Sequence, residues 1–247
     1  MSKTQADENF LIVRLDGRDF HILTEAMGVE RPFDLHFALS IVEATKTILQ
    51  DSPRPAFAYT ISDEVNFVFS DRSNQDSLNS MGSALTKRFS KAFHNAIRPY
   101  SGRKPSHFDW RVWGTDSSGI LSYLAERQEW AYTNFLKAYA FWLKIASGLS
   151  PIQARESLSG FNSPNFLELM SQAELDPEKL PLWQRRGIIV CKRRSSFSPD
   201  QKPGDSCDLY VDLEVPLFKS SHGLSYIVNL LNDENTRLHG VAPEVDG

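Results

Sequence analysis

The pattern of residues 56–69, "AFAYTISDEVNFVF", is the basis of the fold that the sequence predicts. Two short runs of apolar, β-branched and aromatic residues, 56–60 and 64–69, flank a break that contains the polar pair Ser62 and Asp63. Runs of this length around a short polar break are typical of a β-hairpin. The sequence therefore predicts two antiparallel strands with Ser62 and Asp63 at the tip of the turn.

The segments around this hairpin alternate between strand and helix patterns. The expected elements are a buried strand over 10–16, a helix over 31–49, a polar helix over about 76–97 ended by Pro99 and Gly102, and a strand over 108–113. Asp16 ends the first strand, and Asp34 is placed to cap the first helix. The order β-α-β-β-α-β predicts an α+β fold with a ferredoxin-like (split βαβ) antiparallel sheet.

The second half of the chain has a mostly helical pattern. The expected elements are a long helix over 119–148 closed by Gly148, a helix started by Ser150 and Pro151, strands over 185–194 and 207–218, a helix over 223–231 and a frayed tail over 241–247. No internal repeat or composition break divides the chain. We expect a single catalytic unit over 1–247, with a palm-like core over about 1–115 and a helical, finger-like part over about 116–247.

Composition argues against a disulfide-rich or membrane-spanning protein and favours a soluble cytoplasmic protein. The 247 residues carry a net charge of −4, and the sequence pI is about 5.9. A polyanion would therefore bind through local basic patches. Two cysteines, Cys191 and Cys207, make no disulfide framework, which favours a reducing compartment. The first residues carry no leader pattern, and no apolar run is long enough to predict a membrane helix.

Two carboxylates and a glycine form the first candidate site. Asp16 ends one strand and Asp63 lies at the hairpin tip, so neighbouring strands would bring both to one edge of the sheet. Two carboxylates and a backbone carbonyl are oxygen ligands that suit Mg²⁺. Gly17 lets the backbone approach phosphates closely. An Asp-Gly pair is also a common turn, and only the two aspartates together favour a metal site.

Two basic stretches without acidic residues form the second candidate site. Their cations are Lys87, Arg88, Lys91, Arg98, Arg103 and Lys104 in the first stretch, and Arg185, Arg186, Lys192, Arg193 and Arg194 in the second. Lys87 and Lys91 lie one helical turn apart and share a face. Such a face suits a triphosphate or an RNA backbone, although basic helix faces are often only solvated.

These motifs together resemble the tRNA-His guanylyltransferases and their Thg1-like relatives. The similar stretches are "RLDGRDFHILTE", "RPFD", "AYTISDEVNFVF", "TKRFSKAF", "FDWRV", "YLAERQEWAYTN", "SGLSPIQARESLSG" and "LPLWQRRGI". They occur in the family's order and cover roughly residues 10–192. The last fifty or so residues match only loosely, through "DLEVPLF".

The resemblance implies a polymerase-palm fold, two Mg²⁺ ions and a homotetramer. It also implies an enzyme that adds nucleotides in the 3′→5′ direction to the 5′ end of tRNA or another structured RNA. ATP or GTP first activates the 5′-monophosphate. The 3′-hydroxyl of the incoming nucleotide then attacks the activated phosphate.

The resemblance also assigns roles to individual residues. The metal ligands would be Asp16, the Gly17 carbonyl and Asp63, with Glu64 as a third catalytic carboxylate. The nucleotide-binding residues would be Asp16, Gly17, Arg18, Asp19, Phe20, His21, Arg31, Ser62, Asp63, Lys87, Arg88 and Lys91. The RNA-binding residues would be Arg111, Arg127 and Arg186. Glu64 could instead be a solvated residue at a strand edge, His21 a packed histidine, and Arg111 or Arg127 a structural ion-pair partner.

One departure separates the chain from the tRNA-His-specific members of that family. The long helix carries Tyr132 where the family usually has a histidine, and Phe135 in place of an asparagine. The family histidine is tied to handling tRNA-His, so its replacement favours the Thg1-like branch, which repairs truncated RNA 5′ ends. Tyr132 could stack on a base or pack in the core.

Other functions remain open at the level of sequence. The first is strict addition of G−1 to tRNA-His, and the second is a palm-domain synthase of a signal nucleotide, which would turn over nucleoside triphosphates without RNA. The third is a non-catalytic RNA-binding protein, against which the two intact aspartates argue. A metal-dependent phosphohydrolase is a weaker alternative, since no His-Asp pair supports it. The RNA substrate and the activating nucleotide stay undetermined.

Overall fold

The computed structural model describes residues 10–50, 55–70, 78–97, 107–194 and 207–239. Its centre is a six-stranded sheet in the order β4-β1-β3-β2-β5-β6, in which every neighbouring pair is antiparallel. The strands are β1 (Phe10–Arg18), β2 (Phe57–Ile61), β3 (Glu64–Phe69), β4 (His107–Thr115), β5 (Ile188–Arg194) and β6 (Cys207–Asp212). The first four have the predicted ferredoxin-like order, and the other two extend the sheet beyond β2.

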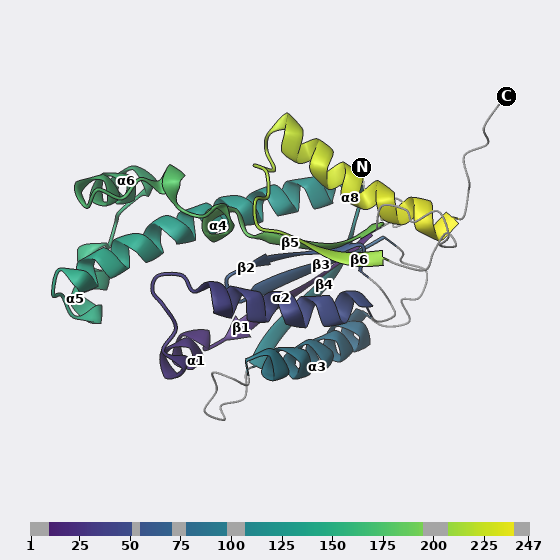
Figure 1. Ribbon diagram of the computed structural model, residues 1–247, viewed down its shortest axis with the longest axis horizontal. Helices are drawn as coiled ribbons and strands as arrows, with labels where there is room; N and C mark the ends of the chain where they lie inside the picture. The colour runs from purple at the N-terminus through teal and green to yellow at the C-terminus, as the bar shows by residue number, and fades with distance from the viewer. Residues whose placement is uncertain (1–9, 51–54, 71–77, 98–106, 195–206, 240–247) are drawn as a thin grey trace, which may run out of the picture.

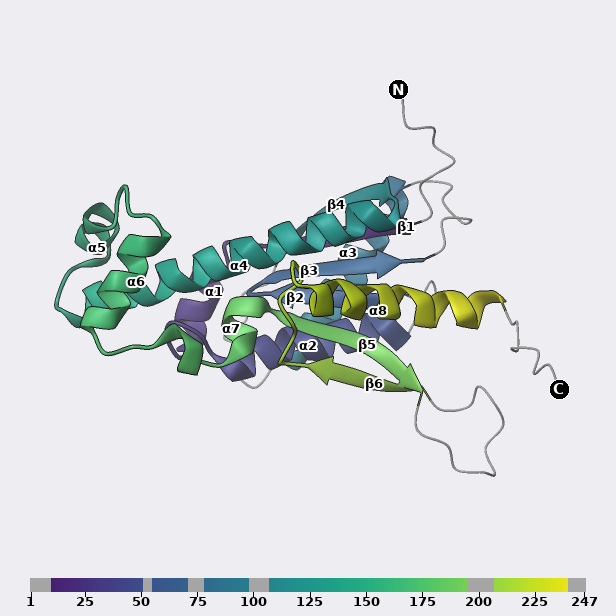
Figure 2. The same cartoon turned by 90° about the horizontal axis from the view of Figure 1, so that it is seen from above.

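Helices cover both faces of this sheet (Figures 1 and 2). They are α1 (Phe20–Met27), α2 (Leu35–Gln50), α3 (Leu78–Ala96), α4 (Ser117–Ala146), α5 (Pro151–Ser157), α6 (Ser163–Gln172), α7 (Leu182–Arg186) and α8 (Ser221–His239), with a 3₁₀ turn at Pro177–Lys179. Helices α2 and α3 lie on one face, and the first half of α4 lies with α8 on the other. The predicted α+β class is confirmed.

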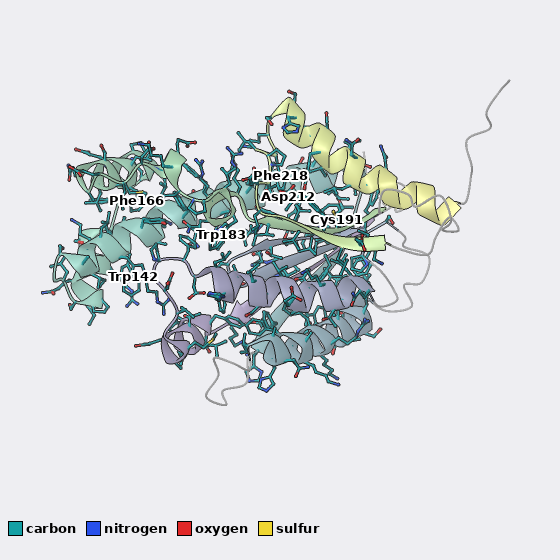
Figure 3. All side chains as sticks on the ribbon, in the orientation of Figure 1. Trp142, Phe166, Trp183, Cys191, Asp212 and Phe218 are labelled. Atoms are coloured by element: carbon teal, nitrogen blue, oxygen red, sulfur yellow. The ribbon has the colours of Figure 1, made fainter. Side chains whose placement is uncertain are left out.

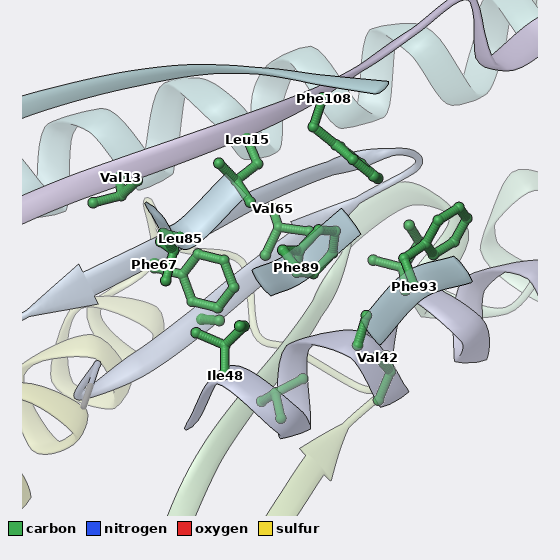
Figure 4. Packing of buried hydrophobic residues seen from close by; sticks show 14 of the residues in the cluster. Val13, Leu15, Val42, Ile48, Val65, Phe67, Leu85, Phe89, Phe93 and Phe108 are labelled. Carbon is green, nitrogen blue, oxygen red and sulfur yellow. The ribbon is translucent and has the colours of Figure 1, made fainter. Parts of the chain in front are cut away.

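Each face of the sheet has its own hydrophobic core. On the α2–α3 face, side chains such as Val13, Leu15 and Phe67 pack against Phe89 and Phe93 of α3 (Figure 4). On the other face the strands pack against α4 and α8, mainly through the side chains of Ile12, Phe57, Tyr59, Ile120, Leu124, Ile227 and Leu231. The central strands therefore carry apolar residues on both faces, as expected for strands between two helical layers.

The second half of α4 projects beyond the sheet, where α5 and α6 pack beside it (Figures 1 and 2). A third apolar cluster holds this part together, with Phe135, Leu136 and Ala140 of α4 against Phe166 and Met170 of α6. Capping boxes start both short helices, and Ser150 is the N-cap of α5 as the sequence predicted. Gly148 has φ +93° just beyond α4, and its N–H donates to the carbonyl of Ile145 at 2.9 Å.

Several boundaries differ from the predictions. Strand β1 continues through Gly17 to Arg18, because it pairs with β4 along its whole length. The segment after it forms α1, which the sequence analysis did not predict. This short helix is stabilised by packing, since Phe20 and Leu23 are buried in the first core.

The late strands are shorter than predicted. Arg185 and Arg186 belong to α7, and Gly187, with φ +75°, separates them from β5. Strand β6, at the edge of the sheet, ends at Asp212 and does not extend to residue 218. The predicted helix ends at Pro99 and Gly102, three cations of the first basic stretch (Arg98, Arg103 and Lys104) and the tail over 241–247 lie outside the described residues. Within the described residues, no helix is long and apolar enough to span a membrane.

Candidate active site

The two predicted carboxylates lie at the same edge of the sheet. Strand β1 pairs with β3 so that Asp16 faces Glu64, the residue after Asp63. The N–H of Gly17 donates to the backbone carbonyl of Asp63 at 3.2 Å. Pairing of β1 with β3 therefore brings the hairpin tip beside Asp16, as the split βαβ arrangement predicts.

Gly17 is required by close packing at this point. A Cβ atom built on Gly17 would lie 2.6 Å from Oδ2 of Asp63 and closer still to the Phe20 ring. No side chain fits there without moving one of these neighbours. Ser62, with φ +54°, is in a left-handed conformation that costs a non-glycine residue some energy. The turn and the glycine together hold the Asp63 carboxylate against β1.

The environment of Asp63 favours binding of a cation. Burial raises the pKa of the Asp63 carboxyl group to about 6, and the charge of Asp16 contributes to the same rise. No ion pair to Asp63 occurs in the part of the chain that the structure describes. The Asp16 side chain is 44% exposed and pairs with Arg14. A bound cation would favour both ionised carboxylates.

The donor set fits Mg²⁺ better than a metal with an all-protein cage. The described residues include no group of three or more His, Cys, Asp or Glu side chains placed to hold a metal ion. The residues present are two carboxylates and the Gly17 carbonyl. Mg²⁺ usually binds through one or two carboxylates and keeps water or substrate phosphate as its other ligands.

Glu64, the third predicted carboxylate, is buried within an ion-pair network. Its side chain is only 2% exposed. Oε1 accepts from Nε of Arg127 at 2.9 Å, and Oε2 accepts from Nη2 of the same guanidinium at 2.6 Å. Nε of Arg14 lies 2.9 Å from Oε2, and the amide of Asn66 donates to Oε1 at 2.9 Å. Glu64 thus fixes two arginines beside the candidate metal site.

Arg127, predicted to bind RNA, is occupied by this network. Its side chain is 15% exposed and is held by both oxygens of Glu64. Its guanidinium carbon also lies 4.6 Å from the centre of the Trp130 ring. The structure therefore places Arg127 as an ion-pair partner, which the sequence analysis had left open.

A cleft of about 490 Å³ opens beside the hairpin tip. Five predicted nucleotide-binding residues line it, namely Phe20, His21, Arg31, Ser62 and Asp63. The opposite wall comes from the second half of α4 and from α5, and includes Asn134, Lys137, Phe141, Trp142 and Arg155. These residues of α4 and α5 were not predicted from the sequence to belong to a site. An exposed lysine within an apolar helix carries no local signal of its role.

The basic cluster of α3 lies outside this cleft. Lys87 and Lys91 are exposed, Arg88 is half-buried, and none of the three lines the cleft. Lys91 precedes Phe93, whose ring centre is 5.5 Å from that of Phe20. The buried face of α3 therefore contacts α1, whereas the two lysines are on its solvent side.

The remaining predicted nucleotide-binding residues lie around the start of α1. Asp16 and Gly17 are at the sheet edge, and Asp19 precedes α1 with φ +57°. Arg18 pairs with Asp109 of β4, and both side chains are 60% exposed. None of these four residues lines the cleft.

The other two predicted RNA-binding residues lie apart from each other. Arg111 is exposed on β4, opposite Arg14 of β1. Burial lowers the pKa of Arg186, and its Nη1 donates to the carbonyl of Val215 at 3.4 Å. The hydroxyl of Tyr59 donates to the Arg186 carbonyl at 2.8 Å. Arg186 thus connects α7 to the sheet and to the segment before α8.

Tyr132, which replaces the family histidine, packs in the third apolar cluster. It is half-buried, and its ring stacks on Phe135 with centres 6.2 Å apart. It does not line the cleft. This packing supports the core role that the sequence analysis left as an alternative to base stacking.

Comparison with known proteins agrees with the motifs. Residues 1–115 match the family model described as tRNAHis guanylyltransferase, Thg1. The chain is 28% identical over 214 residues to tRNA(His) guanylyltransferase 2 of Arabidopsis thaliana, a match that covers 83% of this chain and 40% of the relative. It is 29% identical over 190 residues to a probable tRNA(His) guanylyltransferase of Mus musculus, a match that covers 73% of this chain and 64% of the relative. The match thus spans less than two thirds of these relatives.

Solved structures share the fold. A bacterial tRNA(His) guanylyltransferase (Thg1)-like protein in complex with ATP superposes with a TM-score of 0.73 at 22% identity, covering 91% of each chain. The tRNA(His) guanylyltransferase of Saccharomyces cerevisiae gives a TM-score of 0.65 at 21% identity, covering 74% of this chain and 85% of that one. The predicted resemblance to the tRNAHis guanylyltransferase family is confirmed, and the fold is that of its Thg1-like members.

Proposed function

We propose that this chain, a relative of the tRNAHis guanylyltransferases, is a nucleotidyltransferase that extends RNA 5′ ends in the 3′→5′ direction. The observation that carries the proposal is the convergence of Asp16 and Asp63 at Gly17, beside a cleft open to solvent. Relatives named for guanylyl transfer to tRNA(His), and a structural neighbour solved with ATP, support this choice of reaction.

In the proposed reaction, Asp16, the Gly17 carbonyl and Asp63 would hold two Mg²⁺ ions. Bound Mg²⁺ would stabilise the charge that develops on the attacking and leaving phosphate oxygens. The RNA 5′-monophosphate first displaces pyrophosphate from ATP or GTP. The 3′-hydroxyl of the incoming nucleotide then displaces the nucleoside monophosphate from the activated 5′ end. Glu64 contributes by holding Arg14 and Arg127 in place.

Nucleotide phosphates would bind at two places. Arg31 and Ser62 line the cleft beside Asp63, with Phe20 and His21 from α1. Lys87, Arg88 and Lys91 would hold a second triphosphate on α3 by charge-assisted hydrogen bonds. Two sites are expected because activation and addition each use a nucleoside triphosphate.

We favour 5′-end repair over strict addition of G−1 to tRNA-His. Tyr132 takes the place of the family histidine and is turned into the apolar cluster around α6. Its ring packs on Phe135, which favours a structural role over recognition of a base. A homotetramer and a cytoplasmic location belong to the same proposal.

The test is a 5′-end extension assay. The protein is incubated with Mg²⁺, labelled nucleoside triphosphates and a 5′-monophosphorylated tRNA that lacks its first nucleotide, beside full-length tRNA-His. We expect the truncated tRNA to be extended with the template-matched base. Extension of tRNA-His alone by one G would instead establish the guanylyltransferase reaction.

Two further results would contradict the proposal. Consumption of triphosphates without extension of either RNA would point to a synthase of a signal nucleotide. RNA binding without any turnover would point to a non-catalytic RNA-binding protein. An Asp63→Asn variant, which keeps the size of the side chain, serves as the control for metal-dependent chemistry.

A further inference from the structure

The outer half of the cleft carries positive charge that the proposed nucleotide site does not use. Lys137 and Arg155 both line it. Neither has an ion pair with a carboxylate in the described part of the chain. Lys137 and Arg155 are exposed, so they would be solvated cations at the mouth of the cleft.

Aromatic rings contact Arg155 and also Arg31 of the neighbouring nucleotide site. The guanidinium carbon of Arg31 lies 5.4 Å from the centre of the Trp142 ring, and that of Arg155 lies 5.8 Å from the Phe141 ring. The two rings are neighbours, with centres 5.5 Å apart. Trp142 sits on the part of α4 that projects beyond the sheet (Figure 3). Cations and aromatic faces in one groove are the combination that binds single-stranded nucleic acid.

Distance along α4 separates this half from the carboxylates. Arg127 bonds Glu64, the residue after Asp63, and Lys137 follows Arg127 by ten residues in the same helix. At 1.5 Å per residue these two positions are about 15 Å apart along the axis. Stacked nucleotides place one phosphate per strand about every 3.4 Å, so this distance corresponds to about four phosphates. A triphosphate has three, which would remain near the metal-binding carboxylates.

A single nucleotide would leave the outer cations without partners. With its triphosphate at Asp63, it would place a neutral base, and no phosphate, at the far end of the cleft. The two cations there, Lys137 and Arg155, fit a chain of phosphates that enters from solvent.

We infer that the outer half of the cleft, with Lys137, Arg155 and the Trp142 ring, binds the backbone and bases of the RNA strand whose 5′ end reacts at Asp63. This inference deepens the proposed function and rests on it. It assigns RNA contact to two residues outside the predicted RNA-binding set of Arg111, Arg127 and Arg186. Of that set, Arg127 is committed to Glu64.

The test measures binding without turnover. Fluorescence anisotropy of a short, 5′-monophosphorylated single-stranded RNA is titrated with the wild-type chain, Lys137→Gln, Arg155→Gln and the double variant over a range of salt concentrations. ATP binding is measured on the same samples. Lys179→Gln is the matched control, because Lys179 is 83% exposed and does not line the cleft.

We expect the double variant to bind RNA at least about tenfold more weakly at low salt. The slope of log K against log salt should become shallower by about 1.4, since each phosphate contact on a single strand contributes about 0.7. ATP binding and the Lys179→Gln variant should match wild type.

Three results would overturn the inference. They are weaker ATP binding with unchanged RNA binding, an equal loss of RNA binding in Lys179→Gln, and no effect of the double variant on either ligand. Absence of RNA binding by the wild-type chain would also overturn it. Metal-dependent triphosphate turnover that is lost in Asp63→Asn would still test the proposed chemistry separately.

Discussion

Asp63 and Glu64 are neighbours in the chain, and the fold gives them opposite surroundings. Glu64 is almost fully buried and shares its oxygens between two arginines. Asp63 has no ion pair in the described structure, and burial raises the pKa of its carboxyl group to about 6. Successive residues of an extended chain point to opposite sides, so the step from the turn into β3 is enough to send the two side chains apart.

The comparison separates a structural carboxylate from a reactive one. Paired charges in a buried network contribute mainly to holding elements together, and removing one partner leaves the other uncompensated. An unpaired carboxylate with a perturbed pKa at the edge of a cleft is a candidate for chemistry. Substitutions at and around these two positions can separate the structural role of Glu64 from the chemical role of Asp63.

Asp63→Asn should reduce triphosphate turnover by about a thousandfold or more, because it removes one of two charged metal ligands. Steady-state kinetics at saturating Mg²⁺ would measure this loss. Asp208→Asn, an exposed residue of β6, should leave turnover within about twofold of wild type. Retained activity in Asp63→Asn would remove Asp63 from the metal site.

Glu64→Ala should lower the free energy of unfolding by about 3–5 kcal/mol, because Arg14 and Arg127 would lose a shared buried partner. Urea denaturation followed by circular dichroism would measure the change. The control is Glu129→Ala, which breaks an exposed pair with Lys219 and should cost about 0–1 kcal/mol. Equal losses in the two variants would show that the Glu64 network has no special structural role.

Gly17→Ala should reduce turnover by about a hundredfold and destabilise the fold by about 1–3 kcal/mol, since the new methyl group would displace Asp63 or Phe20. The matched control is Gly28→Ala, where a Cβ meets no atom within 4 Å but φ is +63°. That variant should lose about 1 kcal/mol of stability and keep its turnover. Normal kinetics in Gly17→Ala would contradict the close packing of Gly17 with Asp63.

Asp63→Asn should also raise the melting temperature at pH 7 in the presence of a chelator. A folded-state pKa of about 6, above the ordinary 3.8, means that the folded chain binds this proton more tightly than the unfolded chain. The stability contributed by the group is therefore present below pH 4 and lost as the pH rises to 6. The side-chain amide of the variant does not ionise and has no such loss. We therefore expect the free energy of unfolding of Asp63→Asn at pH 7 to exceed that of wild type by about 1–3 kcal/mol.

Thermal melts from pH 4 to pH 7 would follow this gain, which should grow with pH and level off above pH 6. The control is Asp16→Asn, because Asp16 is half-exposed and already paired with Arg14. If the difference in stability between Asp63→Asn and wild type were the same at every pH, the Asp63 carboxyl group would not be the cause of the pH dependence.

Lys91→Ala should have the smallest effect, about a fivefold rise in the nucleotide KM with little change in kcat. Exposed charge-assisted contacts to phosphate contribute modestly, and Lys91 lies on α3 outside the cleft. The comparison is Lys46→Ala on α2, which removes a lysine paired with Glu43 and should leave KM unchanged. An unchanged KM in Lys91→Ala would exclude this residue from the triphosphate site.

Local sequence patterns were sufficient to predict several parts of the molecule. The hairpin with Asp63 at its tip, the strand that ends near Asp16 and the capped helix at Ser150 all follow from residues within a few positions of one another. The order of these elements was enough to predict the ferredoxin-like sheet, and the motifs along it were enough to indicate the resemblance to the tRNAHis guanylyltransferases.

The residues that share a site could be identified only from the folded molecule. Glu64 meets Arg127 across 63 positions of sequence, and neither residue signals its partner. Lys137 and Arg155 reach the cleft because the end of α4 projects beyond the sheet and α5 folds back beside it. Their role depends on long-range packing of apolar faces, which fixes the angle between distant elements, and no local pattern of charge encodes that angle.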